Sequence, residues 1–229
     1  MRKSRAVVTL SGGADSATML YLAMQRGPDV HAISINYGQR HVKELDCAKK
    51  LCDLNDIPHT IIPFDLSIFG GSPLTDSTMD VPAQNEGKQA STVVPYRNTF
   101  VAVIAAAYCK ANGLNTIYMG PTHEDLANYE DCRPVFFESL QQLLLLAGTI
   151  HDLELLTPFI TTTKDEIIRT GQMLGVPYQH TWTCYKGEDE PCMTCDSCIE
   201  RMESFRLNGM NDPILSDANW TKYMKGFNE

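Results

Sequence analysis

The chain has 229 residues, of which 43% are hydrophobic, and a formal net charge of −9. This length suits one α/β domain with elaborations, or one domain with a small subdomain. The acidic excess argues against a general nucleic-acid or membrane surface, because both need a basic face. No apolar run reaches transmembrane length and no signal-peptide pattern follows the basic start, so we expect a cytoplasmic protein whose eight cysteines do not form disulfides.

The first structured stretch predicts an anion site. An apolar run at 6–10 reads as a buried strand, the run Ser-Gly-Gly-Ala-Asp-Ser follows at 11–16, and residues 16–24 have helical character. Glycines let the backbone approach a phosphate, and the N–H groups at a helix start point at it. Asp15 would repel a polyphosphate unless it holds Mg²⁺ or caps the helix. The alternative is an ordinary glycine turn; a Walker loop is excluded because no Gly-Lys-Ser/Thr follows.

Alternating strands and helices predict a parallel sheet. Residues 30–36 and 59–64 read as strands, and 42–54 as the helix between them. Ligands of such sheets bind at the carboxyl ends of the strands. Arg40 follows the second strand and could approach phosphates there; a solvated helix start is the alternative.

A long polar segment and a misplaced cation come next. Residues 70–92 are rich in Gly, Pro, Ser and Asp and too long for a simple connection, which indicates a lid or a disordered loop. A helix is predicted to start at Asn98 or Thr99. Arg97 then lies at a helix start, against the dipole, which favours an anionic partner over a surface role.

The second half of the sheet carries a charged loop and an apolar helix. A fourth strand at 114–120 runs into a loop at 121–134 with four carboxylates, one His and one Arg, a composition that suits substrate recognition and metal binding. An acidic solvated loop is the alternative. The helix at 135–147 is apolar nearly all round, so we expect it in the core, with a subunit interface as the alternative.

A capping box precedes the last helix of this half. After a fifth strand at 155–159, Thr163 and Glu166 have the spacing of a capping box that opens a helix over 165–174, and Gly175 ends it. Lys164 is a second cation near a helix start, which could reach a phosphate or remain solvated.

Four cysteines cluster late in the chain. Cys184, Cys192, Cys195 and Cys198 are separated by seven, two and two residues. Two-residue gaps place sulfurs on one metal, and four thiolates make a closed tetrahedral Zn²⁺ site. A four-Cys iron–sulfur cluster has similar ligands, but zinc fits a short loop joined to a following helix better.

These patterns predict a Rossmann-like α/β fold with a five-stranded parallel sheet and helices on both faces. We place a nucleotide-binding domain at 1–180 and a small zinc-binding subdomain at 181–229.

Several motifs resemble known families. The run at 11–16 resembles the pyrophosphate loop of the ATP-pyrophosphatase (adenine nucleotide alpha hydrolase) superfamily. A narrower resemblance, to the 7-cyano-7-deazaguanine synthase family, extends nearly end to end. It is carried by the four cysteines, the loop and the runs at 37–41 (Tyr-Gly-Gln-Arg-His), 94–98 (Val-Pro-Tyr-Arg-Asn), 129–133 (Tyr-Glu-Asp-Cys-Arg) and 183–185 (Thr-Cys-Tyr).

The resemblance implies that 7-carboxy-7-deazaguanine is adenylated by ATP with Mg²⁺, that ammonia displaces AMP to give an amide, and that a second activation gives the nitrile preQ0. It implies no direct nucleic-acid partner, no membrane and a homodimer. The implied catalytic residues are Ser11, Asp15, Ser16, Arg97 and Arg133. The implied ATP contacts are Leu10, Ser11, Gly12, Gly13, Ala14, Asp15, Ser16, Ala17, Thr18, Met19, Leu20, Arg40 and Lys164. The implied substrate contacts are Arg97, Asp125, Tyr129, Asp131 and Arg133.

One run departs from the family pattern. Where the family has Ser-Gly and then Pro, this chain has Ala127-Asn128 and Glu130. The lost hydroxyl and glycine leave two alternatives open: a related ligase that stops at the amide or activates another carboxylate, including a protein end, or a non-catalytic nucleotide-binding module.

Overall fold

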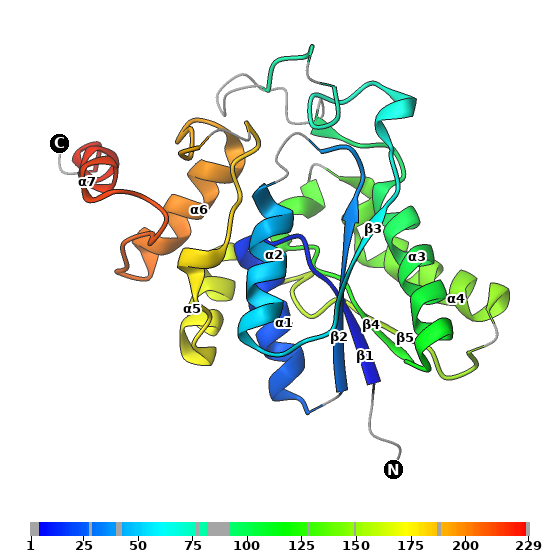
Figure 1. Cartoon of the computed structure of the whole chain (residues 1–229). Helices are drawn as coiled ribbons and strands as arrows, with labels where there is room; N and C mark the ends of the chain where they lie inside the picture. The colour runs from blue at the N-terminus through cyan, green and yellow to red at the C-terminus, as the bar shows by residue number, and fades with distance from the viewer. Residues whose placement is uncertain are drawn as a thin grey trace.

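A five-stranded, all-parallel sheet forms the centre of the protein, as predicted (Figure 1). The computed structural model describes residues 5–27, 29–39, 43–76, 78–81, 92–127, 129–148, 150–186 and 189–227. The strands lie in the order β3-β2-β1-β4-β5. Their bounds are Arg5–Thr9 (β1), Asp29–Asn36 (β2), His59–Pro63 (β3), Thr116–Tyr118 (β4) and Glu154–Leu156 (β5).

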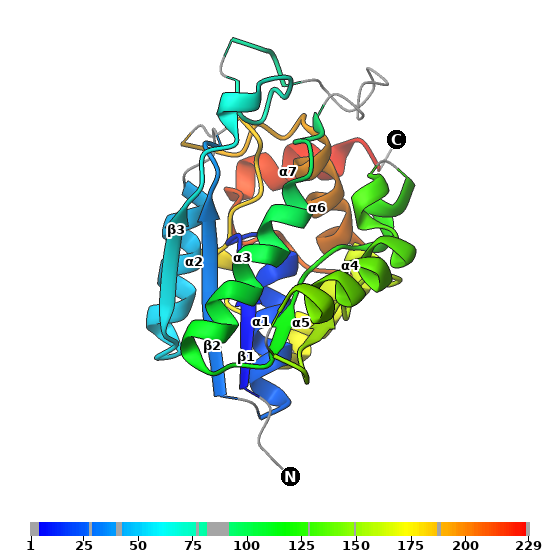
Figure 2. The same cartoon turned by 90° about the vertical axis from the view of Figure 1, so that its right-hand side faces the viewer.

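Helices cover both faces of the sheet (Figures 1 and 2). The α-helices of the described residues are α1 (Ala14–Gln25), α2 (Lys43–Leu54), α3 (Arg97–Asn112), α4 (Pro134–Ala147), α5 (Lys164–Leu174), α6 (Asp196–Leu207) and α7 (Asp217–Lys225). Side chains alternate along β1: Ala6 and Val8 join a buried cluster with residues of α1, α2 and α5, whereas Val7 joins the cluster with α3 and α4. A central parallel strand is thus buried on both faces.

The chain reverses its direction of travel across the sheet next to β1. It moves outward from β1 to β2 and β3, then returns to place β4 on the other side of β1. Such a switch point leaves a crevice outside the carboxyl ends of the strands, where ligands of open α/β sheets bind.

Helix α4 differs from the prediction. We expected it to be buried nearly all round, yet Val135, Leu143 and Leu146 are 64%, 50% and 87% exposed. Only Phe137, Leu140 and Leu144 of this helix are buried. The reason is geometric: α4 lies on the outer side of the molecule beside α3, so only one stripe of the helix meets the core (Figure 2).

Two helix starts were predicted from local signals. Helix α5 has the expected capping box, with the Thr163 N–H donating to Glu166 Oε2 over 3.1 Å, and ends at Gly175 in the left-handed conformation. Helix α3 begins at Arg97, one or two residues earlier than predicted, because Tyr96 adopts a left-handed φ of 56° and turns the chain directly into the helix.

The C-terminal helices pack on the same core as the sheet. Met202 and Phe205 of α6 and Trp220 of α7 lie in the cluster that contains Leu20 of α1 and Ile168 of α5. The division at residue 180 stays a prediction. Within the described residues, no helix is both long enough and apolar enough to span a membrane.

Candidate active site and cysteine centre

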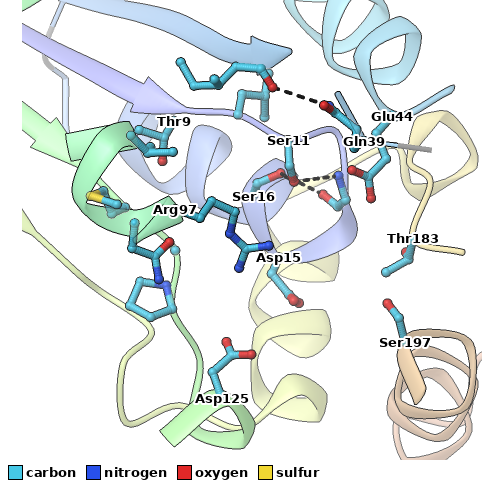
Figure 3. Close-up of a pocket in the computed structure, with 18 of the residues that line it drawn as sticks. Thr9, Ser11, Asp15, Ser16, Gln39, Glu44, Arg97, Asp125, Thr183 and Ser197 are labelled. Atoms are coloured by element: carbon cyan, nitrogen blue, oxygen red, sulfur yellow. Dashed lines mark hydrogen bonds between the residues drawn. The ribbon is translucent and has the colours of Figure 1, made fainter. Parts of the chain in front are cut away.

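A cavity of about 260 Å³ opens at the carboxyl ends of the central strands (Figure 3). Its walls come from the loop after β1, the ends of β2 and β4, the starts of α3 and α5, and the segment before α6. Its polar and charged lining includes Ser11, Asp15, Ser16, Tyr37, Gln39, Glu44, Arg97, Asn98, Asp125, Lys164, Thr183, Tyr185 and Ser197.

The loop after β1 is held in place by its own serines. Ser11 Oγ accepts from the Gly13 N–H over 3.2 Å and lies 3.0 Å from Ser16 Oγ, which accepts from the Gly12 N–H over 3.2 Å. Gly12 has a φ of +97° and packs so closely on α2 that a methyl group would overlap the carbonyl oxygen of Glu44. The loop therefore presents the first turn of α1, with N–H groups that have no helical acceptor, to the cavity.

Asp15 lies in a part of the cavity where carboxylates outnumber cations. Burial raises its pKa to about 6; Lys164 opposes the shift, while Asp125, Glu200 and Glu124 add to it. Lys164 is ion-paired with Glu200, and its backbone N–H donates to Glu124 Oε1 over 3.0 Å. Glu124 Oε2 is buried and has no partner among the described residues. Clustered carboxylate oxygens are the donor set that Mg²⁺ prefers, so these residues fit that ion.

Arg97 also lines the cavity, at the first turn of α3. It lies close to Tyr37, whose pKa is raised chiefly by burial and is held down in part by the guanidinium. Next to it, Asp131 accepts from the Asn98 N–H over 3.4 Å. The cation that the sequence placed at a helix start thus faces the cavity, while Asp131 bonds to the start of the same helix.

The structure brings some predicted site residues together and places others elsewhere. Besides Asp15 and Arg97, it places Leu10, Ser11, Gly13, Ala14, Ser16, Asp125 and Lys164 in the cavity wall. Gly12 packs against α2 and does not line the cavity, and the α1 residues Ala17, Thr18, Met19 and Leu20 are buried. Tyr129, Asp131 and Arg133 are outside the described cavity lining.

The bonds of the residues outside the lining explain their positions. The Arg133 side chain is exposed, and its Nε donates to the Leu126 carbonyl over 3.4 Å. The Tyr129 hydroxyl lies 2.7 Å from Thr92 Oγ1 at the end of the predicted lid. Arg40, Asn128 and residues 82–91 of that lid lie outside the described residues.

Several lining residues were not singled out from the sequence. Gln39, Glu44 and Ser197 lie in the cavity wall, as do Thr183 and Tyr185 on either side of Cys184. Gln39, Thr183 and Tyr185 fall in runs that carry the family resemblance, and that resemblance was the only sequence signal for them. The side toward which each residue points depends on packing between distant segments.

The four late cysteines meet in one cluster. The sulfurs of Cys184, Cys192, Cys195 and Cys198 all lie within 4.8 Å of one another. Three backbone or side-chain donors reach Cys192 Sγ: the N–H groups of Thr194 and Cys195, over 3.5 and 3.4 Å, and the Thr194 hydroxyl over 3.5 Å. Donors of this kind stabilise thiolates, so the cluster fits a metal ion with sulfur ligands.

The chain is similar to known proteins over most of its length. The family described as "Queuosine biosynthesis protein QueC" matches residues 5–209. The chain is 41% identical to a 7-cyano-7-deazaguanine synthase of Trichodesmium erythraeum, over 92% of this chain and 100% of the relative. It is 38% identical to one of Archaeoglobus fulgidus (98% and 95% covered) and 42% identical to one of Marinobacter nauticus (91% and 95%). Among solved structures, an NMN synthetase from Francisella tularensis covers 97% of this chain and 86% of its own, with a TM-score of 0.48 and 15% identity.

Proposed function

The chain belongs to the 7-cyano-7-deazaguanine synthase family, and from that premise we propose how it works as an ATP-using ligase of queuosine biosynthesis. The substrate is 7-carboxy-7-deazaguanine, and the product is 7-cyano-7-deazaguanine (preQ0). The observation that carries the proposal is one cavity that combines the Ser-Gly-Gly-Ala-Asp-Ser loop with Asp15, Arg97, Asp125 and Lys164.

The reaction proceeds through two activations. A carboxylate oxygen attacks the α phosphorus of ATP, pyrophosphate leaves, and ammonia then displaces AMP to give the amide. The amide oxygen is adenylated in the same way, and loss of AMP and protons gives the nitrile. The protein contributes mainly position and charge: the N–H groups at the start of α1 receive phosphate oxygens, and Lys164 and Arg97 offset developing negative charge.

Two metal ions complete the site in this proposal. Asp15 and Glu124 would hold Mg²⁺, which would offset the phosphate charge that these carboxylates would otherwise repel. The four cysteines hold Zn²⁺ in a closed site with a structural role.

Substrate selection is assigned to the part of the cavity near Asp125 and Arg97. Asp125 Oδ2 accepts from the N–H and the hydroxyl of Thr122, both over 2.9 Å, which fixes the carboxylate in the wall. A fixed carboxylate can accept from paired N–H donors such as those of a guanine-like edge. Ala127 is exposed and is not among the lining residues, which favours the view that the departure at this position is tolerated.

Free ammonia is the proposed nitrogen source, the cytoplasm the proposed location and a homodimer the proposed assembly. The exposed leucines of α4 support self-association, because large exposed apolar side chains on one helix are typical of protein interfaces.

The test incubates the zinc-loaded protein with ATP, Mg²⁺, ammonium and 7-carboxy-7-deazaguanine, and follows product mass and AMP, with Asp15→Ala as the inactive control. The nitrile mass with AMP is expected. The amide alone would assign the chain to a ligase that stops after one activation. No AMP, with ATP still bound, would point to another acceptor or to a non-catalytic module.

A further inference from the structure

Two threonines beside the cysteine cluster share one arginine but differ in one bond. Arg201 Nη1 donates to Thr181 Oγ1 over 2.8 Å and to Thr183 Oγ1 over 3.0 Å. The Thr181 hydroxyl in turn donates a hydrogen bond to the Tyr178 carbonyl over 2.7 Å. Among the described residues, the Thr183 hydroxyl has no acceptor for its proton.

The two threonines also differ in their position relative to the cavity. Thr183 is a lining residue, whereas Thr181 is 1% exposed and does not reach the wall. A hydroxyl carries one proton, and a guanidinium can only donate to its oxygen. Because Arg201 donates to the Thr183 oxygen, the Thr183 hydroxyl is left to donate its proton toward the cavity. Arg201 itself is held in position by two hydrogen bonds to the buried Asp212 carboxylate, of 2.7 and 2.9 Å.

Thr183 is also tied to the nucleotide loop. The N–H of the preceding residue, Trp182, donates to the Gly12 carbonyl over 2.9 Å. Figure 3 shows Thr183 and Arg97 on opposite sides of Asp15. In phosphoryl transfer the attacking and leaving oxygens lie roughly in line through the phosphorus. With the substrate on the Arg97 side and the α phosphorus near Asp15, an in-line leaving group would lie toward Thr183.

We propose that the Thr183 hydroxyl donates a hydrogen bond to the pyrophosphate part of ATP and stabilises it as it leaves. This assignment rests on the proposed nucleotide site at residues 11–16. The partner of Thr183 is a β- or γ-phosphate oxygen, not the AMP part of the nucleotide.

The test compares Thr183→Val with Thr183→Ser and uses Thr181→Val as the matched control, because it removes the other hydroxyl bonded to the same Arg201 nitrogen. Calorimetry with Mg²⁺ measures the binding of ATP, inorganic pyrophosphate and AMP to the zinc-loaded protein. Thr183→Val should weaken ATP and pyrophosphate binding by about 10- to 100-fold, the loss expected for one hydrogen bond to a charged group, with AMP binding unchanged. Thr183→Ser should restore binding, and Thr181→Val should bind all three ligands as the wild type does.

Two results would overturn the assignment. Unchanged pyrophosphate binding in Thr183→Val would mean that the hydroxyl only packs in the wall, and an equal loss for AMP would place it on another part of the nucleotide. A wild-type protein that binds neither ATP nor pyrophosphate would instead refute the nucleotide site on which the assignment rests.

Discussion

Asp15 shows how one side chain can serve a site at a cost to the fold. Its carboxylate is held among Asp125, Glu200 and Glu124, and burial raises its pKa from 3.8 to about 6. A raised pKa in the folded state means that folding favours the protonated form. The stability that this preference contributes is fully present below about pH 4, the pKa of Asp15 in the unfolded chain. It is lost as the pH rises through about 6, the pKa in the folded protein.

We therefore expect Asp15→Asn to raise the free energy of unfolding of the nucleotide-free protein at pH 7 by about 1 to 2 kcal/mol, somewhat less than two pKa units imply because the side chain is partly exposed. Urea unfolding between pH 4 and 7 measures it, and the difference should shrink toward pH 4. Asp46→Asn, at an exposed position of α2, is the control and should change little. Equal stabilisation by both variants would show that net charge alone is responsible.

Arg201 stabilises the fold, whereas the Asp15 carboxylate destabilises it, because the buried charge of Arg201 is paired with Asp212. Its side chain is 4% exposed and that of Asp212 is 1% exposed. Arg201→Ala should lower the free energy of unfolding by about 3 to 5 kcal/mol, since it leaves a buried carboxylate without a partner. Lys49→Ala, which breaks the exposed pair with Asp53, should change the free energy of unfolding far less, because solvent screens that pair. Denaturant titration compares the two, and similar losses would contradict the burial argument.

The contact between the first loop and α2 depends on a missing side chain. Gly12 combines a positive φ with a carbonyl of α2 where a Cβ would stand, whereas Gly175, at the end of α5, has a positive φ of 74° and open space around it. At Gly175 only the backbone conformation favours glycine, whereas at Gly12 both the conformation and the close contact with α2 require it.

Gly12→Ala should therefore displace the loop from α2, with a large loss of stability and of ATP binding. Gly175→Ala should cost only about 1 kcal/mol, the conformational term alone, and should bind ATP normally. Thermal unfolding and calorimetry measure both. If Gly12→Ala bound ATP like the wild type, the loop would not depend on its fit against α2.

The segment that carries the cysteine cluster also forms part of the cavity wall. Cys184 lies between two lining residues, Thr183 and Tyr185, and Ser197 lines the cavity between Cys195 and Cys198. Cys47 of α2 packs against the same cluster. The proposed metal thus holds together residues 184–198, a segment that forms part of the cavity wall and packs against α2.

Removal of the proposed zinc ion should weaken ATP binding before the sheet unfolds. The measurement treats the protein with a chelator, restores Mg²⁺, and follows metal content, ATP affinity and far-ultraviolet circular dichroism. We expect lost zinc and weaker ATP binding with most of the secondary structure retained, and recovery when zinc returns. An affinity that does not change after complete zinc loss would mean that the wall holds its position without the metal.

Local spacing determined much of this protein from the sequence. The alternation of strands and helices predicted the parallel sheet. Short spacings predicted the capping box of α5 and the metal-ligand pattern of Cys192, Cys195 and Cys198, because backbone geometry fixes the position of residues two to four apart. The family, too, could be identified from runs of a few residues.

Tertiary packing decided which side chains share the site. Asp125 faces the cavity while Asp131, six residues on, bonds to the start of α3. Tertiary packing also places Thr183 in the cavity wall and Thr181 behind it, and it leaves half of α4 exposed. These outcomes depend on contacts between segments far apart in the chain, such as Trp182 with Gly12, and no local pattern encodes the direction from which a distant segment will pack.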